Sequence, residues 1–547
     1  MVQEKAAAPA PGAVATGGPP DGLPRERTGG KALRRVPAGR IAGAVVGGLL
    51  LFLSFPPLGL WFLTPFGVAL VTLSVYGSRP RRALWLGFLA GFAFLLPALH
   101  WVSPIGVDAW LGLVAMESLF YAAWAVGAAL VVRLPLWPLW SAALWVAMEW
   151  ARGTFPFGGF PWARVAFSQG QSVFTPFAAL GGAPLVSFAV ALCGGLIALV
   201  ALRLAPAPRW NRAVALPLAG ALAVPAAAFA VPRPGDEART VTVGVIQGNV
   251  PGRGMTPLGD EPAVVLGNHT RMLHEMARAV REGRTPRPDL VVLPENSTDI
   301  DPYRSEFAHR EIDAAVKDIG VPVLVGAVVG IGENNRATRS LVWDPVTGPG
   351  AYYDKQQLVP FGEYTPLKDL VLALFERAGL VGKQSVAGTR DGDLKLGPVT
   401  LGAINCYEVA FDGIVRGTVR TGATPLTVQT NNATYALTNL PAQQLAMSQL
   451  RAVEHNRAVV TSAITGISAY VTPEGEVAWH TAELVPAMNV FRVPVRTAET
   501  IATRVGALPE WALILVGTGA LAAVWRRRTR TLVHSTDQEA DHQVGDA

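Results

Sequence analysis

The chain contains eight long stretches with few charged residues, seven before and one after a central region of mixed character. Each stretch is close to the ~20 residues that a helix needs to cross a bilayer. They lie at about residues 38–55, 57–76, 83–104, 108–132, 134–152, 175–203, 213–231 and 507–525. The pattern therefore predicts an α-helical membrane bundle of eight spans.

The central region has the shorter periods of an α/β domain. Runs rich in Val, Ile and Leu predict strands at residues 241–250, 289–295, 321–329, 400–406 and 424–430, with further strands up to about residue 495. Apolar residues at helical spacing predict helices at 263–282, 307–319, 411–421 and 441–457. Such alternation indicates layers of helices packed on sheets.

The composition supports a membrane protein. Hydrophobic residues make up 50% of the 547 residues and charged residues only 16%, and the mean hydropathy is +0.33. These values exclude an ordinary soluble protein. A net charge of +6 is also compatible with nucleic-acid binding, but the basic residues flank the apolar stretches, so we expect no nucleic-acid partner.

Arginine clusters predict the orientation of the bundle. They lie before the first stretch and after the second, fourth, sixth and eighth: Arg34, Arg35 and Arg40; Arg79, Arg81 and Arg82; Arg133; Arg203, Arg209 and Arg212; Arg526, Arg527, Arg528 and Arg530. With eight spans all of these clusters fall on one side, which the positive-inside rule makes the cytoplasmic side. The central domain is then extracytoplasmic.

These patterns divide the chain into five parts. We expect a disordered cytoplasmic tail at residues 1–36, a seven-helix transmembrane domain at 37–232, an extracytoplasmic α/β domain at 233–500, an eighth transmembrane helix at 501–530 and a cytoplasmic tail at 531–547.

Cys406 ends one of the predicted strands, and a tyrosine and a glutamate follow it directly. Catalytic side chains commonly lie where such strands end. The only other cysteine, Cys193, lies in an apolar stretch, so no disulfide framework is expected. Considered alone, however, a free cysteine is more often a small buried hydrophobe than a nucleophile.

Two further polar residues at the edges of elements favour a nucleophile. Glu295 ends the predicted strand at 289–295, and Lys355 precedes a turn that contains Pro and Gly. A thiol needs a base to become the reactive thiolate, and a tetrahedral intermediate needs a positive or N–H partner for its oxyanion. Glu295 is a candidate for the base and Lys355 for the oxyanion partner.

Four blocks in this order resemble the nitrilase superfamily and, within it, the apolipoprotein N-acyltransferase family of bacterial membrane enzymes. The blocks are Val245–Pro251, Leu293–Asn296, Lys355–Tyr364 and Asn405–Glu408, and the resemblance covers roughly residues 240 to 495. It implies that the extracytoplasmic domain beside the eight-span bundle is a nitrilase-like α-β-β-α sandwich. It also implies a catalytic triad of Glu295, Lys355 and Cys406.

The resemblance implies supporting roles for three neighbours of the triad. Glu363, eight residues after the lysine, would orient that lysine or assist the proton shuttle, and Tyr407 and Glu408 would shape the pocket beside the nucleophile. One feature departs from the family pattern: residues 252–256 contain no Trp after the first block, where family members often carry one. How the substrate is gripped at that place is therefore open.

The reaction implied by the resemblance is acyl transfer in two steps. The cysteine takes a fatty acyl chain from a membrane phospholipid as a thioester, and the α-amino group of the N-terminal diacylglyceryl-cysteine of an apolipoprotein then accepts that chain. The enzyme would be a multi-pass protein of the bacterial plasma (inner) membrane, with its catalytic domain on the extracytoplasmic side. No cofactor is implied, and the eight scattered His residues predict no metal site.

Two other functions remain as alternatives. A membrane-anchored nitrilase-type amidase or hydrolase would use the same triad, but a single span would be enough to anchor it. A catalytically silent scaffold or lipid-binding membrane protein would have no reason to keep Glu295, Lys355 and Cys406 in three matching local contexts.

Two segments outside the triad have more than one interpretation. The loop at 149–162 is rich in aromatic residues, Pro and Gly, as an interfacial segment would be, and its Glu149 is either a polar site or the ion-pair partner of Arg152. The oily insertion at 365–382 either packs on the core of the domain or forms an arm that dips into lipid and guides acyl chains to Cys406.

Overall fold

The computed structural model describes residues 37–205, 211–235, 239–252, 263–374, 379 and 381–545. The chain from Ala38 onwards forms one compact unit, and everything below concerns this unit. The tail expected at residues 1–36 lies outside the described residues, as does most of the segment without Trp, residues 253–256.

Each of the eight apolar stretches contains a helix. Before the sheets come α1 (Ala38–Leu53), α2 (Thr64–Val75), α3 (Pro80–Ala98), α4 (Val107–Val131), α5 (Trp137–Arg152), α6 (Ala178–Leu204) and α7 (Arg212–Ala227), and after them come α13 (Ile501–Val505) and α14 (Leu508–Gly545). Among the described residues, five helices are long and apolar enough to cross a membrane: α3, α4, α6, α7 and α14. Because α1 and α2 are shorter apolar helices, the number of eight spans stays a prediction.

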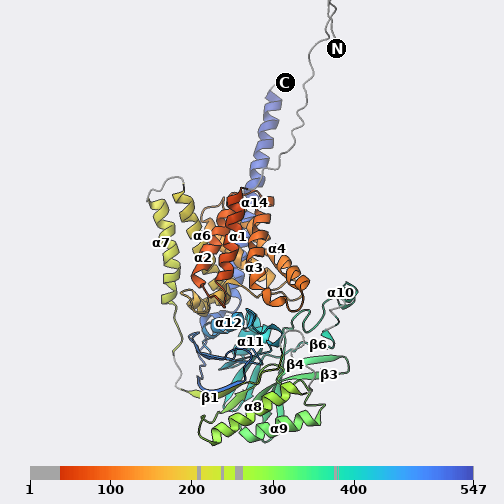
Figure 1. Cartoon of the computed structure of the whole chain (residues 1–547). Helices are drawn as coiled ribbons and strands as arrows, with labels where there is room; N and C mark the ends of the chain where they lie inside the picture. The colour runs from red at the N-terminus through yellow and green to blue at the C-terminus, as the bar shows by residue number, and fades with distance from the viewer. Residues whose placement is uncertain are drawn as a thin grey trace, which may run out of the picture. The chain divides into compact units, whose positions relative to one another are not determined.

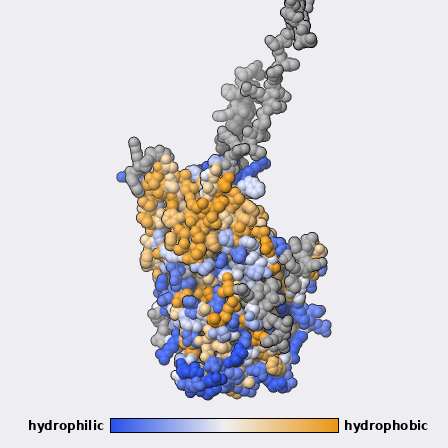
Figure 2. All heavy atoms as spheres, in the orientation of Figure 1, coloured by the Kyte–Doolittle hydropathy of each residue, from blue (hydrophilic) through white to orange (hydrophobic). Residues whose placement is uncertain are grey.

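Small residues let the helices of the bundle approach one another closely. A Cβ added to Gly87 of α3 would lie 2.4 Å from the Cβ of Ala125 on α4, and one added to Gly48 of α1 would lie 2.3 Å from the carbonyl oxygen of Ala90 on α3. Van der Waals contact of this kind holds helices together in lipid, where burial of apolar surface gives little driving force. Figure 2 shows hydrophobic residues gathered over the outside of the bundle, where Trp85 of α3 is 63% exposed.

The central region folds into two sheets. The first has the strand order β13 (Ala487–Pro494), β1 (Thr240–Gln247), β2 (Leu290–Val292), β3 (Val323–Ile331), β4 (Asn335–Asp344) and β5 (Gly348–Asp354), with β6 (Gln384–Ser385) beside β4. The second has the order β12 (Val477–His480), β11 (Ala469–Val471), β10 (Val459–Ala463), β9 (Leu426–Thr430), β8 (Val399–Asn405) and β7 (Asp393–Leu396). Each sheet contains three adjacent parallel strands, β1 to β3 in the first sheet and β8 to β10 in the second. The carboxyl ends of these three strands therefore lie on the same edge of their sheet.

Apolar side chains join the two sheets and the outer helices. Val243 and Val292 of the first sheet share one buried cluster with Leu401 and Val460 of the second. A second cluster joins the first sheet to the apolar faces of α8 (Val264–Arg281) and α9 (Glu306–Ile319). On the second sheet, α11 (Asp412–Arg420) contacts β8 and α12 (Leu440–His455) contacts β10.

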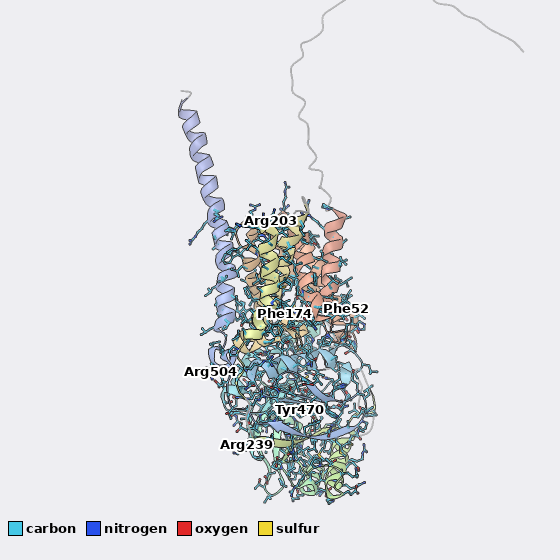
Figure 3. The ribbon with its side chains drawn as sticks, turned by 90° about the vertical axis from the view of Figure 1, so that its left-hand side faces the viewer. Phe52, Phe174, Arg203, Arg239, Tyr470 and Arg504 are labelled. Carbon is cyan, nitrogen blue, oxygen red and sulfur yellow. The ribbon has the colours of Figure 1, made fainter. Side chains whose placement is uncertain are left out.

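Helix α12 lies between the second sheet and the bundle. It contacts β10 and also α6, and Figure 1 shows α11 and α12 next to the bundle helices, with α8 and α9 farthest from them. Figure 3 places Arg203, near the end of α6, at the end of the bundle remote from the strands. Nearly all of α12 is buried even though many of its side chains are polar, so these side chains need specific partners.

Candidate active site

The three residues of the expected triad follow strands whose carboxyl ends lie on one edge of each sheet. Glu295 comes shortly after β2, Lys355 directly after β5 and Cys406 directly after β8. Strand β4 is antiparallel to both β3 and β5, so β5 runs in the same direction as β2. Three segments that are far apart in the sequence therefore meet, as the sequence predicts.

Cys406 occupies a sharp turn. Its φ of 50° is in the left-handed region, which few residues other than Gly adopt. The residue begins a short 3-10 helix, η7 (Cys406–Ala410), and a capping box holds the turn, because the Asn405 side chain accepts the backbone N–H of Glu408 and the Glu408 carboxylate accepts that of Asn405. The turn therefore lies at the boundary between β8 and η7, and the thiol is at this boundary.

Lys355 lies between two carboxylates. Its Nζ donates to Oε1 of Glu295 at 2.9 Å and to Oε1 of Glu363 at 3.1 Å, and only 2% of the lysine side chain is exposed. The remaining carboxylate oxygens are also held, since the backbone N–H of Asn431 donates to Glu295 and that of Val359 donates to Glu363. The structure thus brings the second glutamate to the lysine, at the position from which it can orient the ammonium.

Burial and charge set the pKa values of this pair. Although burial opposes it, the attraction of Glu295 and then of Glu363 raises the pKa of Lys355 well above its ordinary value. Burial also raises the pKa of Glu295, and the nearby ammonium counteracts this rise. Lys355 therefore carries a positive charge at neutral pH, next to a carboxylate that is unusually ready to take a proton.

The sulfur of Cys406 rests as a thiol. Burial raises the pKa of Cys406 to about 12, and the charge of Glu295 adds to this, whereas Lys355 lowers it. Burial therefore favours the neutral thiol over the thiolate at neutral pH. Nucleophilic attack therefore requires a base that removes the proton as the new bond forms.

Tyr407 attaches the nucleophile's turn to the bundle. Its hydroxyl donates to the carbonyl oxygen of Gly159 at 3.1 Å, and its ring stacks on that of Trp162 with a centroid distance of 6.2 Å and an interplanar angle of 14°. Both partners belong to the loop that follows α5. The residue next to the nucleophile is thus held by the loop that follows α5 of the helical bundle.

Glu408 ties the lysine segment to the cysteine segment. The buried carboxylate accepts the backbone N–H groups of Asn405, Gln356 and Gln357 and the hydroxyl of Tyr353. Burial raises its pKa to about 7, which Lys355 and these hydrogen bonds partly oppose. Its described contacts are all with the scaffold, so Glu408 shapes the site by fixing the two strand ends.

Aromatic rings of the bundle and of the domain pack against one another where the two parts meet, and we call them the aromatic roof. We use this name for Trp101, Phe160 and Trp162 of the bundle together with Tyr407 and Tyr435 of the domain. The ring of Trp101 lies 5.3 Å from that of Trp162 and 5.3 Å from that of Tyr435. Burial raises the pKa of the Tyr435 phenol, and the nearby Cys406 and Glu363 raise it further, which places this ring beside the reacting groups.

Sequence reasoning did not single out several of these residues. Thr430, whose hydroxyl oxygen lies 3.3 Å from the Cys406 sulfur, is the last residue of β9. The same signal that pointed to the triad, a polar residue at the end of a buried strand, also marks Thr430 and Asn431. Trp101 and Gln444 carry no comparable signal, because each reaches the site only through tertiary packing.

Buried charges join the domain to the bundle. Asp412 of α11 accepts from Arg164 of the loop after α5 at 2.8 Å and from Arg451 of α12 at 2.7 Å. Arg451 also donates to the carbonyl oxygen of Val409 at 2.8 Å, close behind the nucleophile. These contacts fix the segment that follows Cys406 from two sides.

Of the two interpretations of Glu149, the ion pair with Arg152 is wrong. Arg152 pairs with Glu117 of α4 at 2.8 Å, and both side chains are completely buried. Glu149 instead accepts from the Trp145 indole and the Val165 backbone N–H and lies 3.6 Å from Arg164. The roles differ because the loop after α5 folds back over the end of its helix.

The oily insertion at 365–382 contains one short helix, α10 (Lys368–Leu374). Leu367 and Leu370 are 64% and 58% exposed, so these two side chains do not pack on the core of the domain. Several residues after this helix lie outside the described part of the chain, and the arm stays a prediction.

Two family models match the chain. The model described as Apolipoprotein N-acyltransferase N-terminal domain matches residues 47–196, and the one described as Carbon-nitrogen hydrolase matches residues 242–487. A protein named Apolipoprotein N-acyltransferase from Mycolicibacterium smegmatis is 40% identical over 508 residues, which cover 88% of this chain and 84% of that protein. The chain belongs to the apolipoprotein N-acyltransferase family. The predicted family and the predicted nitrilase-like domain are thereby confirmed.

Other apolipoprotein N-acyltransferases are also similar over most of their length. Those of Gloeobacter violaceus and Azotobacter vinelandii are 33% and 28% identical, covering 83% and 79% of this chain and 88% and 85% of those proteins. Among solved structures, an amidase from Nesterenkonia sp. is 19% identical, with a TM-score of 0.34. The match covers 47% of this chain and 91% of the amidase chain. The matches to apolipoprotein N-acyltransferases extend over both the bundle and the domain.

Proposed function

We propose that the chain transfers a fatty acyl chain from a membrane phospholipid, through a thioester on Cys406, to the α-amino group of the N-terminal diacylglyceryl-cysteine of an apolipoprotein. The observation that carries the proposal is the Lys355 ammonium, held between Glu295 and Glu363 close to a sulfur that rests as a thiol. Membership of the apolipoprotein N-acyltransferase family supports it.

Acylation is the first step. Glu295 takes the proton of Cys406 as the sulfur attacks the ester carbonyl carbon of the phospholipid. The Lys355 ammonium and the backbone N–H of Tyr407 stabilise the oxyanion of the tetrahedral intermediate. When this intermediate collapses, the carbonyl carbon loses the glycerol oxygen, which takes the proton from the glutamate and leaves as lysophospholipid.

Transfer to the amine is the second step. The α-amino group attacks the thioester carbon through a second tetrahedral intermediate, and Glu295 takes a proton from the nitrogen. The bond between carbon and sulfur then breaks, and the leaving sulfur of Cys406 regains the proton. The product is an N-acylated, triacylated apolipoprotein, and the enzyme returns to its starting state.

The proposal includes the arrangement in the membrane. Residues 37–232 and 501–530 form eight spans in the bacterial plasma (inner) membrane, and residues 233–500 form an α-β-β-α sandwich on its extracytoplasmic side, with residues 1–36 and 531–547 in the cytoplasm. The position of Arg203 at the end of the bundle remote from the strands supports this orientation (Figure 3). The phospholipid donor and the lipoprotein acceptor then reach the site from the same leaflet.

Intact mass spectrometry of the detergent-purified protein tests this function. After incubation with phospholipid and without acceptor, we expect an acyl adduct that hydroxylamine removes, that maps to the Cys406 peptide and that accompanies release of lysophospholipid. Adding a diacylated lipopeptide should discharge the adduct and give a triacylated product. The Cys406→Ala variant is the control, because it keeps every other group of the site.

Absence of the acyl adduct would favour the alternative function, a membrane-anchored amidase. If wild-type protein forms no adduct from phospholipid, releases no lysophospholipid and hydrolyses short amides instead, the acyltransferase proposal fails. The membrane-anchored amidase function would then replace the acyltransferase function, because the same Glu295, Lys355 and Cys406 serve both reactions.

The aromatic roof predicts how the thioester is protected from water. Replacing Trp101 by Ala removes a ring that is 93% buried between Tyr435 and Trp162, so water should reach the acylated cysteine more easily. We expect hydrolysis of the thioester in the absence of acceptor to rise about 5- to 10-fold, with a matching fall in the fraction of chains transferred.

Fatty acid release and lipopeptide acylation are measured on the same acylated sample, so loss of folded protein cancels from their ratio. Trp85→Ala is the matched control, because this Trp lies on the outside of α3 and should leave the ratio unchanged. An unchanged ratio in Trp101→Ala would mean that water is excluded by other means.

A further inference from the structure

The segment that follows β9 touches both the nucleophile and its base. The strands β8 and β9 are parallel and in register, with Asn405 opposite Gln429, so Cys406, directly after β8, and Thr430, the last residue of β9, come next to each other. The Thr430 hydroxyl oxygen lies 3.3 Å from the Cys406 sulfur, and the backbone N–H of Asn431 donates to Glu295 at 2.9 Å. Thr430 itself is fully buried.

The Thr430 hydroxyl has more acceptors than protons. It lies 2.8 Å from Oδ1 of Asn432 and 2.9 Å from Oε1 of Gln444, in addition to the sulfur. A hydroxyl donates only one hydrogen bond, so these three acceptors compete for a single proton. The Gln444 amide also helps to lower the pKa of the Cys406 thiol, and its buried Nε2 has no hydrogen-bond partner among the described residues.

We propose that Thr430, supported by Gln444, is a further catalytic residue that donates its hydroxyl proton to the sulfur of Cys406 only while the sulfur carries negative charge. With a neutral thiol, the closer amide oxygens are the better acceptors and hold the proton. With a thiolate, the charge makes the sulfur the strongest acceptor, because hydrogen bonds to charged groups are shorter and about twice as strong as neutral ones.

This exchange stabilises the charged sulfur more than the thiol or the thioester. Both transition states of the proposed acyl transfer build negative charge on Cys406, once as the proton leaves for Glu295 and once as the sulfur leaves the tetrahedral intermediate. A contact that is stronger in these states than in the ground state accelerates the reaction. No covalent bond to Thr430 forms or breaks, since its proton stays on the oxygen and only changes its acceptor.

The inference rests on the proposed function for its kinetic consequence, but its chemical core is testable without acyl transfer. The test compares Thr430→Val, which has nearly the same shape without the hydroxyl, with Thr430→Ser, which keeps the hydroxyl. Thr427→Val is the matched control, because Thr427 is an equally buried threonine of β9 whose hydroxyl bonds the carbonyl oxygen of Val460. Gln444→Leu tests the supporting amide.

Iodoacetamide alkylation, followed on the Cys406 peptide so that Cys193 does not contribute, reports the thiolate. We expect the rate for Thr430→Val to be about 10-fold lower than that of the wild type at each pH from about 7 to 10, which is a shift of about one pH unit. Thr430→Ser should retain most of the wild-type rate, Gln444→Leu should lose less than Thr430→Val, and Thr427→Val should not differ from the wild type.

Single-turnover acylation by phospholipid separates catalysis from binding. In Thr430→Val the limiting rate should fall about 10-fold while the phospholipid concentration that gives half of this rate stays unchanged. Wild-type alkylation and acylation rates in Thr430→Val would overturn the proposal, as would an equal loss in Thr427→Val.

If Thr430→Val does not fold, Thr430→Ser and Gln444→Leu decide. A wild-type rate in Gln444→Leu together with a large loss in Thr430→Ser would contradict the roles assigned here. An altered alkylation rate in a protein that forms no thioester would refute only the acyl-transfer function.

Discussion

Replacing Lys355 by Met is expected to lower the rate of thioester formation by at least about 10³-fold. Loss of one oxyanion donor alone costs about 10²–10³-fold in rate, and loss of a positioned base costs a further 10²–10⁴-fold. Both effects apply here. Without the ammonium, Glu295 and Glu363 are neighbouring buried carboxylates with no cation between them, so at least one of them takes up a proton.

The pH dependence of the residual activity follows from the same charges. In the wild type the ammonium counteracts the rise that burial causes in the pKa of Glu295. Once Lys355 is removed, only the hydrogen bond from the Asn431 backbone N–H opposes the effects of burial and of the Glu363 charge, so the base is ionised only at higher pH. The acid limb of the pH profile should therefore move to higher pH in Lys355→Met, which a series of single-turnover acylations would measure.

A matched lysine controls for the substitution itself. Lys317 pairs with Asp313 on the surface of α9 and is 58% exposed, so Lys317→Met should leave the acylation rate unchanged. Comparable losses in Lys317→Met and Lys355→Met would show that the effect is not specific to the site. A Lys355→Met enzyme with a wild-type rate and an unmoved pH profile would contradict the assigned role.

Replacing Asp412 by Ala is expected to destabilise the protein by about 3–5 kcal/mol, the usual cost of breaking a buried charge pair. The carboxylate accepts from Arg164 and Arg451, whose side chains are 5% and 1% exposed. Removing it takes away the acidic partner that Arg164 and Arg451 share, in a site that water barely reaches. Among the described acidic residues, Arg164 then keeps only the longer contacts with Glu149 and Glu510, at 3.6 and 3.7 Å, and Arg451 keeps Glu454. The segment behind Cys406 also loses its anchor, so acylation should slow even at temperatures where the protein stays folded.

The stabilising effect of Asp412 should depend on pH. Although burial opposes it, Arg164 and then Arg451 hold the pKa of Asp412 well below its usual range. A carboxylate with a depressed pKa contributes its full stability above the unfolded pKa, about 3.9, and loses it as the pH falls towards the folded value. The difference in Tm between wild type and Asp412→Ala should thus be largest near neutral pH and shrink below about pH 4.

Thermal unfolding in detergent, followed by intrinsic fluorescence, measures both effects. Glu306→Ala is the control, because it breaks the exposed ion pair with Arg310 on α9 and should change Tm little. An Asp412→Ala protein that melts with the wild type across this pH range would show that the junction does not depend on these charges.

Local patterns were enough to predict most helices and the ends of the key strands. The apolar faces of α8 and α9 follow from spacing, and Glu295, Lys355 and Cys406 were recognisable because each polar residue ends or follows an apolar run. Such patterns report burial within one element. For α8 and α9 the pattern is one apolar face against one sheet, whereas β2 and β8 are buried on both faces and are therefore continuous apolar runs.

Residues that depend on two layers at once were not predictable in the same way. Helix α12 has polar residues around much of its circumference, which normally indicates an exposed helix, yet it is buried between the second sheet and the bundle. The pairing of Arg152 with Glu117 rather than Glu149 depends on how α4 packs against α5, which no local pattern contains. Thr430 carried the right local signal, but its partner sulfur is identified only by the register of β8 and β9.

The contact of Tyr407 with the loop after α5 has a consequence for protein engineering. A truncated protein starting near residue 233 would keep both sheets and the triad, but the tyrosine would lose the Gly159 carbonyl, and Gln443 would lose both the Trp162 indole and the Ala98 carbonyl. The face of the domain that contacts the bundle in the whole chain would be exposed to water, with its aromatic and amide groups on the surface. We therefore expect the domain to be a poor catalyst without the bundle, because bundle residues complete part of its interior.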